Sequence, residues 1–521
     1  MTVLLWLARL LLPTVMVAGL IVDARFQTSA DDRDETTGIE TDSAVSSAES
    51  LTSTWYCPTA HSRELEVGGV EARSELVVTN TAAEPTRATI TLISPTSARR
   101  LTHLEVPGLS SRSLEVSDYT TDELVSALIE APISGVAVSR RIRSTYGSDV
   151  ASCSSVVADA WYVVSGDTQA DAVSQLVVYN PLPTDAVIDL SFASEAEVGP
   201  YVPPDLVGLV VPAANTISID IGAHVRRRDV VSATVRARLG RVVVDHLQKF
   251  DGSSGRVGFS AKLATAATST SWYHPVALLG ESESVSVVLS NPTDVVADVD
   301  IIVVSGEGKV GSAIASVGPY DVTRVAVLPK AEEVLVANTL FTSSESFGII
   351  VESSNGIPIV SSIELASGPD GSPGRESSDQ EILEARADSD SIELPDGRES
   401  GLSMAAGAPA GSRNWLLVLP DVPGEILVAV ENTTSAGATA LISRYGKRER
   451  YELKLAAFAI QHLRLAPGNT IEVKSESEVV VAAVHQEPKG AGLSLILGIK
   501  LNPAPFGSRS EEHTSELQSP C

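Results

Sequence analysis

The chain has 521 residues, more than one ordinary hydrophobic core accommodates, so its length predicts several domains. Its formal net charge of −28 at pH 7 disfavours contact with nucleic-acid phosphates or anionic lipid headgroups over most of the surface, and we expect no nucleic-acid partner. Short apolar runs rich in β-branched residues alternate with turn residues, which predicts an all-β fold class.

The first 26 residues have the character of an export signal. Residues 3–22 are apolar apart from Arg9, Thr14 and small residues, and this length approaches the roughly 20 residues that cross a bilayer. No clean Ala-x-Ala cleavage site follows. We predict an uncleaved signal anchor over residues 1–26, with a cleaved signal peptide as the alternative. The protein is then a single-pass cell-membrane protein with the bulk of the chain extracytoplasmic, or a secreted one.

Two acidic segments contain little that could be buried. Residues 27–52 are polar and rich in Ser and Thr, and residues 368–412 are rich in Asp, Glu, Ser and Gly. We predict a disordered acidic linker for the first and a disordered acidic insert for the second. Residues 509–521 match a translation of a common sequencing adapter, and we set them aside as an artefact.

Four similar segments lie between these parts. "STWYCPTA", "DAWYVVSG", "TSWYHPVA" and "RNWLLVLP" each place a tryptophan at the head of an apolar run, and strand–turn–strand patterns follow each of them. The first two tryptophan intervals have the size of one antiparallel sandwich of about 100 residues. We predict four tandem Ig-like antiparallel β-sandwich modules over residues 53–157, 158–268, 269–367 and 413–508. The alternative is β-propeller-like closure, in which each repeat makes two blades.

One asparagine recurs at the same turn in each repeat. An Asn side chain can bond its own backbone and tolerates unusual backbone angles, so we interpret these residues as turn formers. They are Asn80, Asn180, Asn291 and Asn432.

The tryptophans and the tyrosines that follow them point to opposite faces of the predicted first strands, because alternate residues of a strand share a face. We assign the tryptophans to the repeat cores: Trp55, Trp161, Trp272 and Trp415. The tyrosines are possible contact residues for a ligand such as a sugar, although packing between modules explains them as well. They are Tyr56, Tyr162 and Tyr273.

Two cysteines remain once the adapter-like end is excluded. In an exported protein an even pair most simply forms a disulfide, so we predict a bond between Cys57 and Cys153 that clasps the two ends of the first module. Two structural thiols, or a reactive cysteine, are the alternatives.

No pattern for metal binding or catalysis stands out. The histidines are scattered singly, and we expect them on the surface or at strand ends. There is no Cys-x-x-Cys, no Gly-x-Ser-x-Gly and no glycine-rich phosphate loop, and "DSDSIELPDG" lacks the sharp-turn glycine of an EF-hand. We therefore assign no catalytic residue, no metal site and no cofactor.

The anchor, the acidic linker, the "WYCP" motif, the repeated Trp-Tyr starts and the Asn-Pro-Thr turn carry a family resemblance. Over about residues 3 to 505 the chain resembles an uncharacterised actinobacterial family of exported, membrane-anchored proteins of about 500 residues, named only as a domain of unknown function. The resemblance implies an envelope location and no established activity, cofactor or catalytic residue.

These observations favour a non-enzymatic, membrane-tethered protein of the cell envelope, acting as a structural or interaction module array. Its expected partners are envelope proteins or cell-wall polymers. The alternatives are a carbohydrate-binding array for cell-wall polymers and, third, an envelope hydrolase.

Overall fold

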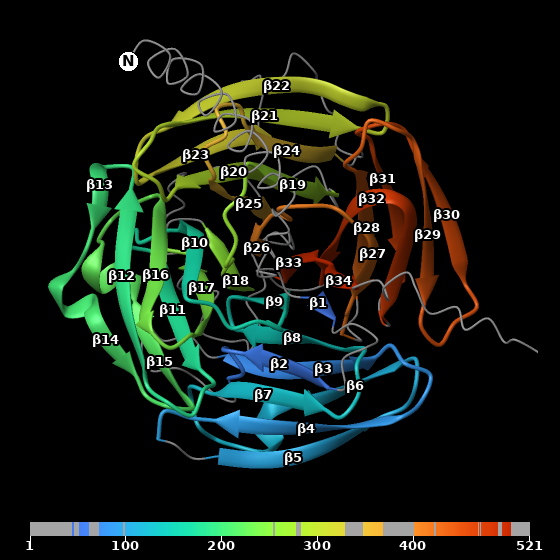
Figure 1. Ribbon diagram of the computed structural model, residues 1–521, viewed down its shortest axis with the longest axis horizontal. Helices are drawn as coiled ribbons and strands as arrows, with labels where there is room; N and C mark the ends of the chain where they lie inside the picture. The colour runs from blue at the N-terminus through green and yellow to red at the C-terminus, as the bar shows by residue number, and fades with distance from the viewer. Residues whose placement is uncertain are drawn as a thin grey trace, which may run out of the picture. The chain divides into compact units, whose positions relative to one another are not determined.

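The structure is a computed structural model (Figure 1). It describes residues 44–45, 52–61, 72–96, 99–253, 256–277, 283–328, 347–367, 401–420, 424–466, 468, 470–487 and 492–501. All of these belong to one unit, Asp42–Cys521. The predicted anchor at residues 1–26 and the adapter-like residues 509–521 lie outside the described part.

The described chain is all-β, with separate antiparallel sheets that recur in pairs. The strands of the first pair are β2 (Ser53–Cys57), β3 (Ala72–Asn80), β4 (Thr86–Ile93), β5 (Arg99–Val106), β6 (Ser110–Glu115), β7 (Ser126–Ala131), β8 (Val136–Ser144) and β9 (Gly147–Ser152). Their sheets have the orders β2-β7-β4-β5 and β6-β3-β8-β9. Apolar side chains from both sheets, such as Trp55 and Leu76, share one hydrophobic cluster. The two sheets therefore enclose a common core.

The second pair has nine strands: β10 (Ala160–Gly166), β11 (Ala172–Asn180), β12 (Ala186–Ser194), β13 (Glu197–Tyr201), β14 (Val207–Val211), β15 (Asn215–Asp220), β16 (Val231–Leu239), β17 (Val243–Asp251) and β18 (Val257–Leu263). One sheet has the order β10-β16-β12-β13, with β14 also on β12, and the other has the order β15-β11-β17-β18.

The third pair has the strands β19 (Ser271–Val276), β20 (Glu283–Asn291), β21 (Ala297–Ser305), β22 (Gly308–Val317), β23 (Asp321–Leu328), β24 (Phe347–Ser353), β25 (Val360–Ser367) and β26 (Gly401–Ala406). Its sheets are β19-β24-β21-β22 and β23-β20-β25-β26. The described helical turns are short: η1 (Val116–Asp118), η2 (Pro204–Leu206) and α2 (Ile221–His224).

All three pairs share one strand order. In the second pair, β13 and β14 both pair with β12, so we count them together as the fourth strand. With this count, the first sheet joins the first, sixth, third and fourth strands, and the second sheet joins the fifth, second, seventh and eighth. In each sheet, the strand in the second position comes from the other half of the segment. Because neither half can leave without breaking both ladders, each pair should fold as one cooperative unit.

The last segment has the same order with two strands fused into one. Its strands are β27 (Ser412–Leu417), β28 (Glu425–Asn432), β29 (Ala438–Arg444), β30 (Arg450–Leu455), β31 (Ile460–Leu465), β32 (Ile471–Gln486) and β33 (Leu493–Leu497). The first part of β32 pairs with β27 and β29, and its last part pairs with β28 and β33. β32 therefore replaces the sixth and seventh strands and merges the two sheets into one nine-stranded sheet.

Two short strands join the beginning of the described chain to its end. β1 (Ala44–Val45) runs parallel to β34 (Ile499–Leu501), which also pairs with β27. The backbone N–H of Ala44 donates a hydrogen bond to Ser155 Oγ at 2.9 Å. The chain thus returns to its own start after the four segments.

The eighth strand of each segment contacts its counterparts in a cycle. β9 contacts β18, β18 contacts β26, β26 contacts β33, and β33 contacts β9, which can be followed at the centre of Figure 1. The approach of β18 to β26 is close, because a Cβ added at Gly258 would lie 2.5 Å from Leu402 Cβ. Only a glycine fits at that point of β18.

Two predicted boundaries are wrong. The acidic linker predicted for residues 27–52 contains β1, and the insert predicted for residues 368–412 contains β26 and the first residue of β27. Residues 401–406 are mostly apolar, and β26 supplies the eighth strand of the third segment, far along the chain from β25. The prediction from composition did not include this strand because acidic residues separate it from the rest of its sheet in the sequence. No helix of the described residues is long and apolar enough to cross a membrane.

Candidate functional site

The four tryptophans occupy equivalent positions inside the sheet pairs, and each is at most 1% exposed. The indole N–H of each donates to a backbone carbonyl at the start of the seventh strand or its equivalent, in Val136, Val242, Ile359 and Val479, at 2.7 to 3.0 Å. An indole N–H that is buried needs such a partner. These residues build cores and leave no indole face for a ligand.

The four asparagines make the same set of bonds in each segment. The side-chain oxygen of Asn80 accepts from the N–H of Ala82, and its amide donates to the carbonyls of Glu84 and Val106. Asn180, Asn291 and Asn432 repeat this arrangement at their own turns. Each asparagine therefore ties the turn after the second strand to the end of the fourth.

The predicted disulfide is present. Cys57, at the end of β2, is bonded to Cys153, which follows β9, and both residues are fully buried. The guanidinium of Arg140 lies 3.8 Å from Cys153 Sγ and forms a fully buried ion pair with Asp245 of the second segment at 2.6 Å. The bond thus closes the first segment next to a charged contact with the second.

The three tyrosines lie at contacts between segments. Tyr56 packs against the cluster of the second segment, Tyr162 belongs to the cluster centred on the third, and Tyr273 packs against that of the fourth. Tyr162 is only 9% exposed, and burial raises the pKa of Tyr56 and Tyr273. These contacts fit the alternative of packing between segments, and the role in ligand contact stays a prediction.

The histidines were expected on the surface or at strand ends, and this is wrong for His61, His246 and His274, which are buried away from strand ends; His485 is buried near the end of β32. Burial lowers the pKa of His61 and His274 to about 3 and that of His246 to about 4. These rings are neutral at physiological pH. Two of them bond Ser174 and Ser361 at 2.8 Å, so they are part of the interior and not of an open cleft.

A buried lysine joins three of the four eighth strands. Lys262 Nζ of β18 donates to Asp149 Oδ1 and the Val150 carbonyl of β9 and to the Leu495 carbonyl of β33, at 2.6 to 2.7 Å. Asp149 also accepts from Ser260 Oγ and the Ala261 N–H. Burial lowers the pKa of Lys262 and raises that of Asp149. All three ammonium donors are used within the protein.

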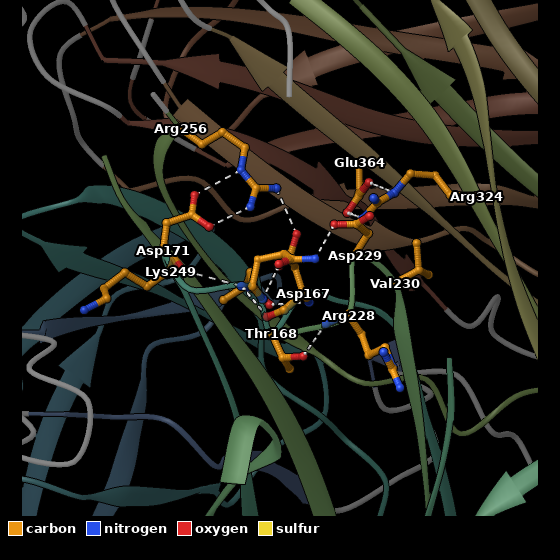
Figure 2. A network of polar contacts seen from close by, with 12 residues as sticks. Asp167, Thr168, Asp171, Arg228, Asp229, Val230, Lys249, Arg256, Arg324 and Glu364 are labelled. Atoms are coloured by element: carbon orange, nitrogen blue, oxygen red, sulfur yellow. Dashed lines mark hydrogen bonds and ion pairs between the residues drawn. The ribbon is translucent and has the colours of Figure 1, made fainter. Parts of the chain in front are cut away.

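A second polar network lies where the second and third segments meet. Figure 2 shows Arg256 between Asp167 and Asp171, with ion-pair distances of 2.8 and 2.9 Å. Arg324 pairs with Glu364 nearby at 2.7 Å. Arg256 also stacks over Phe250 at 4.0 Å. The arginine donors are directed at carboxylates of the chain itself, which is the arrangement of a structural contact.

A surface pocket of about 230 Å³ lies beside β12, β13 and α2 in the second segment. Its lining combines an apolar floor with a phenol, a hydroxyl and cationic side chains: Phe192, Ala193, Ser194, Tyr201, His224, Val225, Arg226 and Arg228. The rings of Phe192 and His224 stack with their centroids 6.4 Å apart. Asp205, 70% exposed, lies 3.8 Å from His224 Nδ1. The lining is cationic on a strongly acidic chain.

No local pattern in the sequence predicts this pocket. Its signal is the run "HVRRRD", three consecutive arginines in a chain with 66 acidic and 38 basic residues. The other lining residues come from β12 and β13, and only the fold brings them to that run. Among the described residues no group of three His, Cys, Asp or Glu could hold a metal ion.

Part of the chain is similar to a known protein family. Residues 133–318 match the family of unknown function DUF5719. The match runs from the end of the first segment through β22 and includes the whole second segment with its pocket. DUF5719 has no assigned activity in its description. No curated protein matches the chain.

Similarity to solved structures is low. A Thermotoga maritima protein designated 1070 has 17% identity and a TM-score of 0.15 over 18% of this chain and 89% of its own. A tetra-tandem repeat from the extending region of a large adhesion protein has 10% identity, a TM-score of 0.10 and coverage of 82% and 95%. A glycoside hydrolase of family 32 from Bifidobacterium adolescentis has 8% identity, a TM-score of 0.13 and coverage of 85% and 99%. TM-scores of this size support no conclusion about fold or function.

Proposed function

We propose that the protein is a non-enzymatic, membrane-tethered extracytoplasmic protein of the cell envelope that acts as a structural or interaction module array. The apolar residues 3–22 and the buried disulfide support a location outside the cytoplasm, since disulfides persist in oxidising compartments. The partners are envelope proteins or cell-wall polymers, and no cofactor takes part.

The four segments are the modules of this array. They are β-sandwiches with a strand order of their own, in place of the immunoglobulin order. The cycle of contacts among β9, β18, β26 and β33 supports closure of the modules around these strands, in the manner of a propeller whose units are sandwiches.

The main support for the proposal is the location of the buried ion pairs. The pairs Arg140–Asp245 and Lys262–Asp149 are buried and join one module to another. A catalytic acid or base has to reach a substrate, whereas these groups are buried and face each other. Their chemistry serves to hold the modules together.

The proposal is tested with the purified full-length protein in detergent. We expect no turnover of wall polysaccharide or wall peptides over many hours, and retention of the protein on isolated cell wall or on envelope proteins. Heat-denatured protein is the control for non-specific retention. Measurable hydrolysis that scales with protein concentration would refute the non-enzymatic role.

A carbohydrate-binding array is the second candidate, and the pocket beside α2 favours it. Tyr201 is 41% exposed and belongs to the pocket, so a sugar ring could stack on it.

A further inference from the structure

Beside the pocket at α2, the described part of the second module has a backbone feature of its own. Five described residues other than glycine have a positive φ, and four of them, Leu109, Ala214, Tyr320 and Phe458, lie at the equivalent turn before the fifth strand. The fifth is Arg227, with φ of 55°. The repeated turn accounts for the positive φ of these four residues, but it does not account for the positive φ of Arg227.

The turn at Arg227 is held by one threonine. The Arg227 N–H donates to the Thr168 carbonyl, the Thr168 N–H donates to the Arg228 carbonyl, and the Arg228 N–H donates to Thr168 Oγ1, at 2.9 to 3.1 Å. A left-handed residue that is not glycine costs of order 1–3 kcal/mol and persists only when its surroundings fix it, often at a functional site.

This turn places two arginines on one pocket. Arg226 and Arg228 line the pocket and Arg227 between them does not. Figure 2 shows the Arg228 side chain directed away from the Asp167–Arg256 network. The nearby carboxylate of Glu195 accepts from the backbone N–H groups of Asp229 and Val230.

The lining selects the chemistry of a ligand. Arginine makes paired, charge-assisted hydrogen bonds to carboxylate and phosphate. The exposed ring of Tyr201 and the floor of Phe192 and Val225 suit the apolar face of a sugar, and Ser194 adds a hydroxyl. The volume lies below the roughly 300 to 1,000 Å³ of sites for drug-sized ligands, so it fits one small group.

We propose that this pocket binds a single acidic sugar unit, a sugar that carries a carboxylate or a phosphate. Tyr201 stacks on the ring and Arg226 holds the anionic group, with Arg228 beside it. The net charge of −28 of the whole chain disfavours an extended polyanion, so the pocket selects a local anionic group. The inference rests on the proposed envelope role for its source of ligand and adds the ligand class and the site.

Calorimetric titration of the full-length protein tests the proposal, with glucuronate, glucose 6-phosphate, glucose and inorganic phosphate as separate probes. We expect binding of one or both acidic sugars, at least about tenfold tighter than glucose and inorganic phosphate. Preference for glucuronate or for glucose 6-phosphate distinguishes a uronic acid from a sugar phosphate as the source.

Three variants assign the site. Arg226→Gln should weaken binding of the acidic sugar about tenfold or more, and Tyr201→Leu should weaken it while leaving any binding of inorganic phosphate unchanged. Arg227→Asn is the matched control, because it removes the same charge one residue away, and Asn tolerates a positive φ. Its affinity should stay within about twofold of the unchanged protein.

Three results would overturn the proposal: no heat from either acidic sugar at millimolar concentration, equal binding of inorganic phosphate and the acidic sugars, or equal losses in Arg226→Gln and Arg227→Asn. Thermal unfolding of each variant shows that the fold is kept. The envelope role fails separately, if the protein is not retained on cell wall or envelope proteins while the sugar still binds.

Discussion

Glu431 is a fully buried carboxyl group in β28, and within the described residues neither of its oxygens has a hydrogen-bond partner. A Cβ added at Gly348 of β24 would lie 2.7 Å from Glu431 Cδ, so the glycine leaves the space that the carboxyl group occupies. Burial raises the pKa of Glu431 well above its usual value. The group is therefore protonated in the folded protein under conditions where it ionises in the unfolded chain.

This gives Glu431 a defined effect on stability as pH changes. The protonated group contributes its full share to the free energy of unfolding below the unfolded pKa of 4.5. As pH rises from there towards the higher folded pKa, this contribution falls by about 1.4 kcal/mol per pH unit. Glu431→Gln stays neutral, so its free energy of unfolding relative to the unchanged protein should rise with pH above 4.5. Urea unfolding of both proteins at several pH values measures the difference, and parallel curves would contradict it.

At the scale of the strand, hydrophobic alternation predicted the positions of the strands better than it predicted which of their faces are buried. The repeated tryptophans and the Asn turns could be found from local pattern because they recur in each segment, and the Cys57–Cys153 pair could be found from the cysteine count. β17 shows the limit. It carries Asp245, His246 and Lys249, yet all of its residues except the last are buried. A neighbouring module covers the face that alternation assigns to solvent, and no local pattern encodes that contact.

The candidate site was missed for the same reason. The "HVRRRD" run is visible in the sequence, but Phe192 and Tyr201 reach it only because β12 pairs with β13 and the fold brings both beside the end of α2. A run of charged residues in the sequence alone predicts a solvated surface.

The disulfide acts at the level of one module, since it joins the end of β2 to the residue after β9, 96 positions apart. Replacing both cysteines, Cys57→Ala with Cys153→Ala, should lower the free energy of unfolding by about 4 to 5 kcal/mol on the chain-entropy model. Guanidinium unfolding under non-reducing conditions measures the loss. The unchanged protein, refolded in reductant after full unfolding, is the control and should approach the double variant. Equal midpoints for the oxidised protein and the double variant would show that the bond adds no stability.

For the whole array, the strongest test concerns the contacts at the eighth strands. Lys262 binds groups of β9 and β33 from its place in β18, and it is 8% exposed. Lys262→Met leaves the Asp149 carboxylate buried without its cation, which costs about 3–5 kcal/mol. Adding Asp149→Leu removes the stranded charge, so the double variant should be more stable than Lys262→Met alone.

The exposed pair Arg238–Asp189 lies within a single sheet and provides the matched control, because removing it should cost no more than about 1 kcal/mol. If the central contacts couple the modules, hydrogen exchange in Lys262→Met should accelerate in β9, β18 and β33 together, while Arg238→Gln leaves these strands unchanged. Exchange that accelerates only within β18 would mean that the modules are stable separately and that the cycle of eighth strands adds no cooperativity. Joint acceleration is the expected result, since the three strands share the hydrogen bonds of one ammonium group.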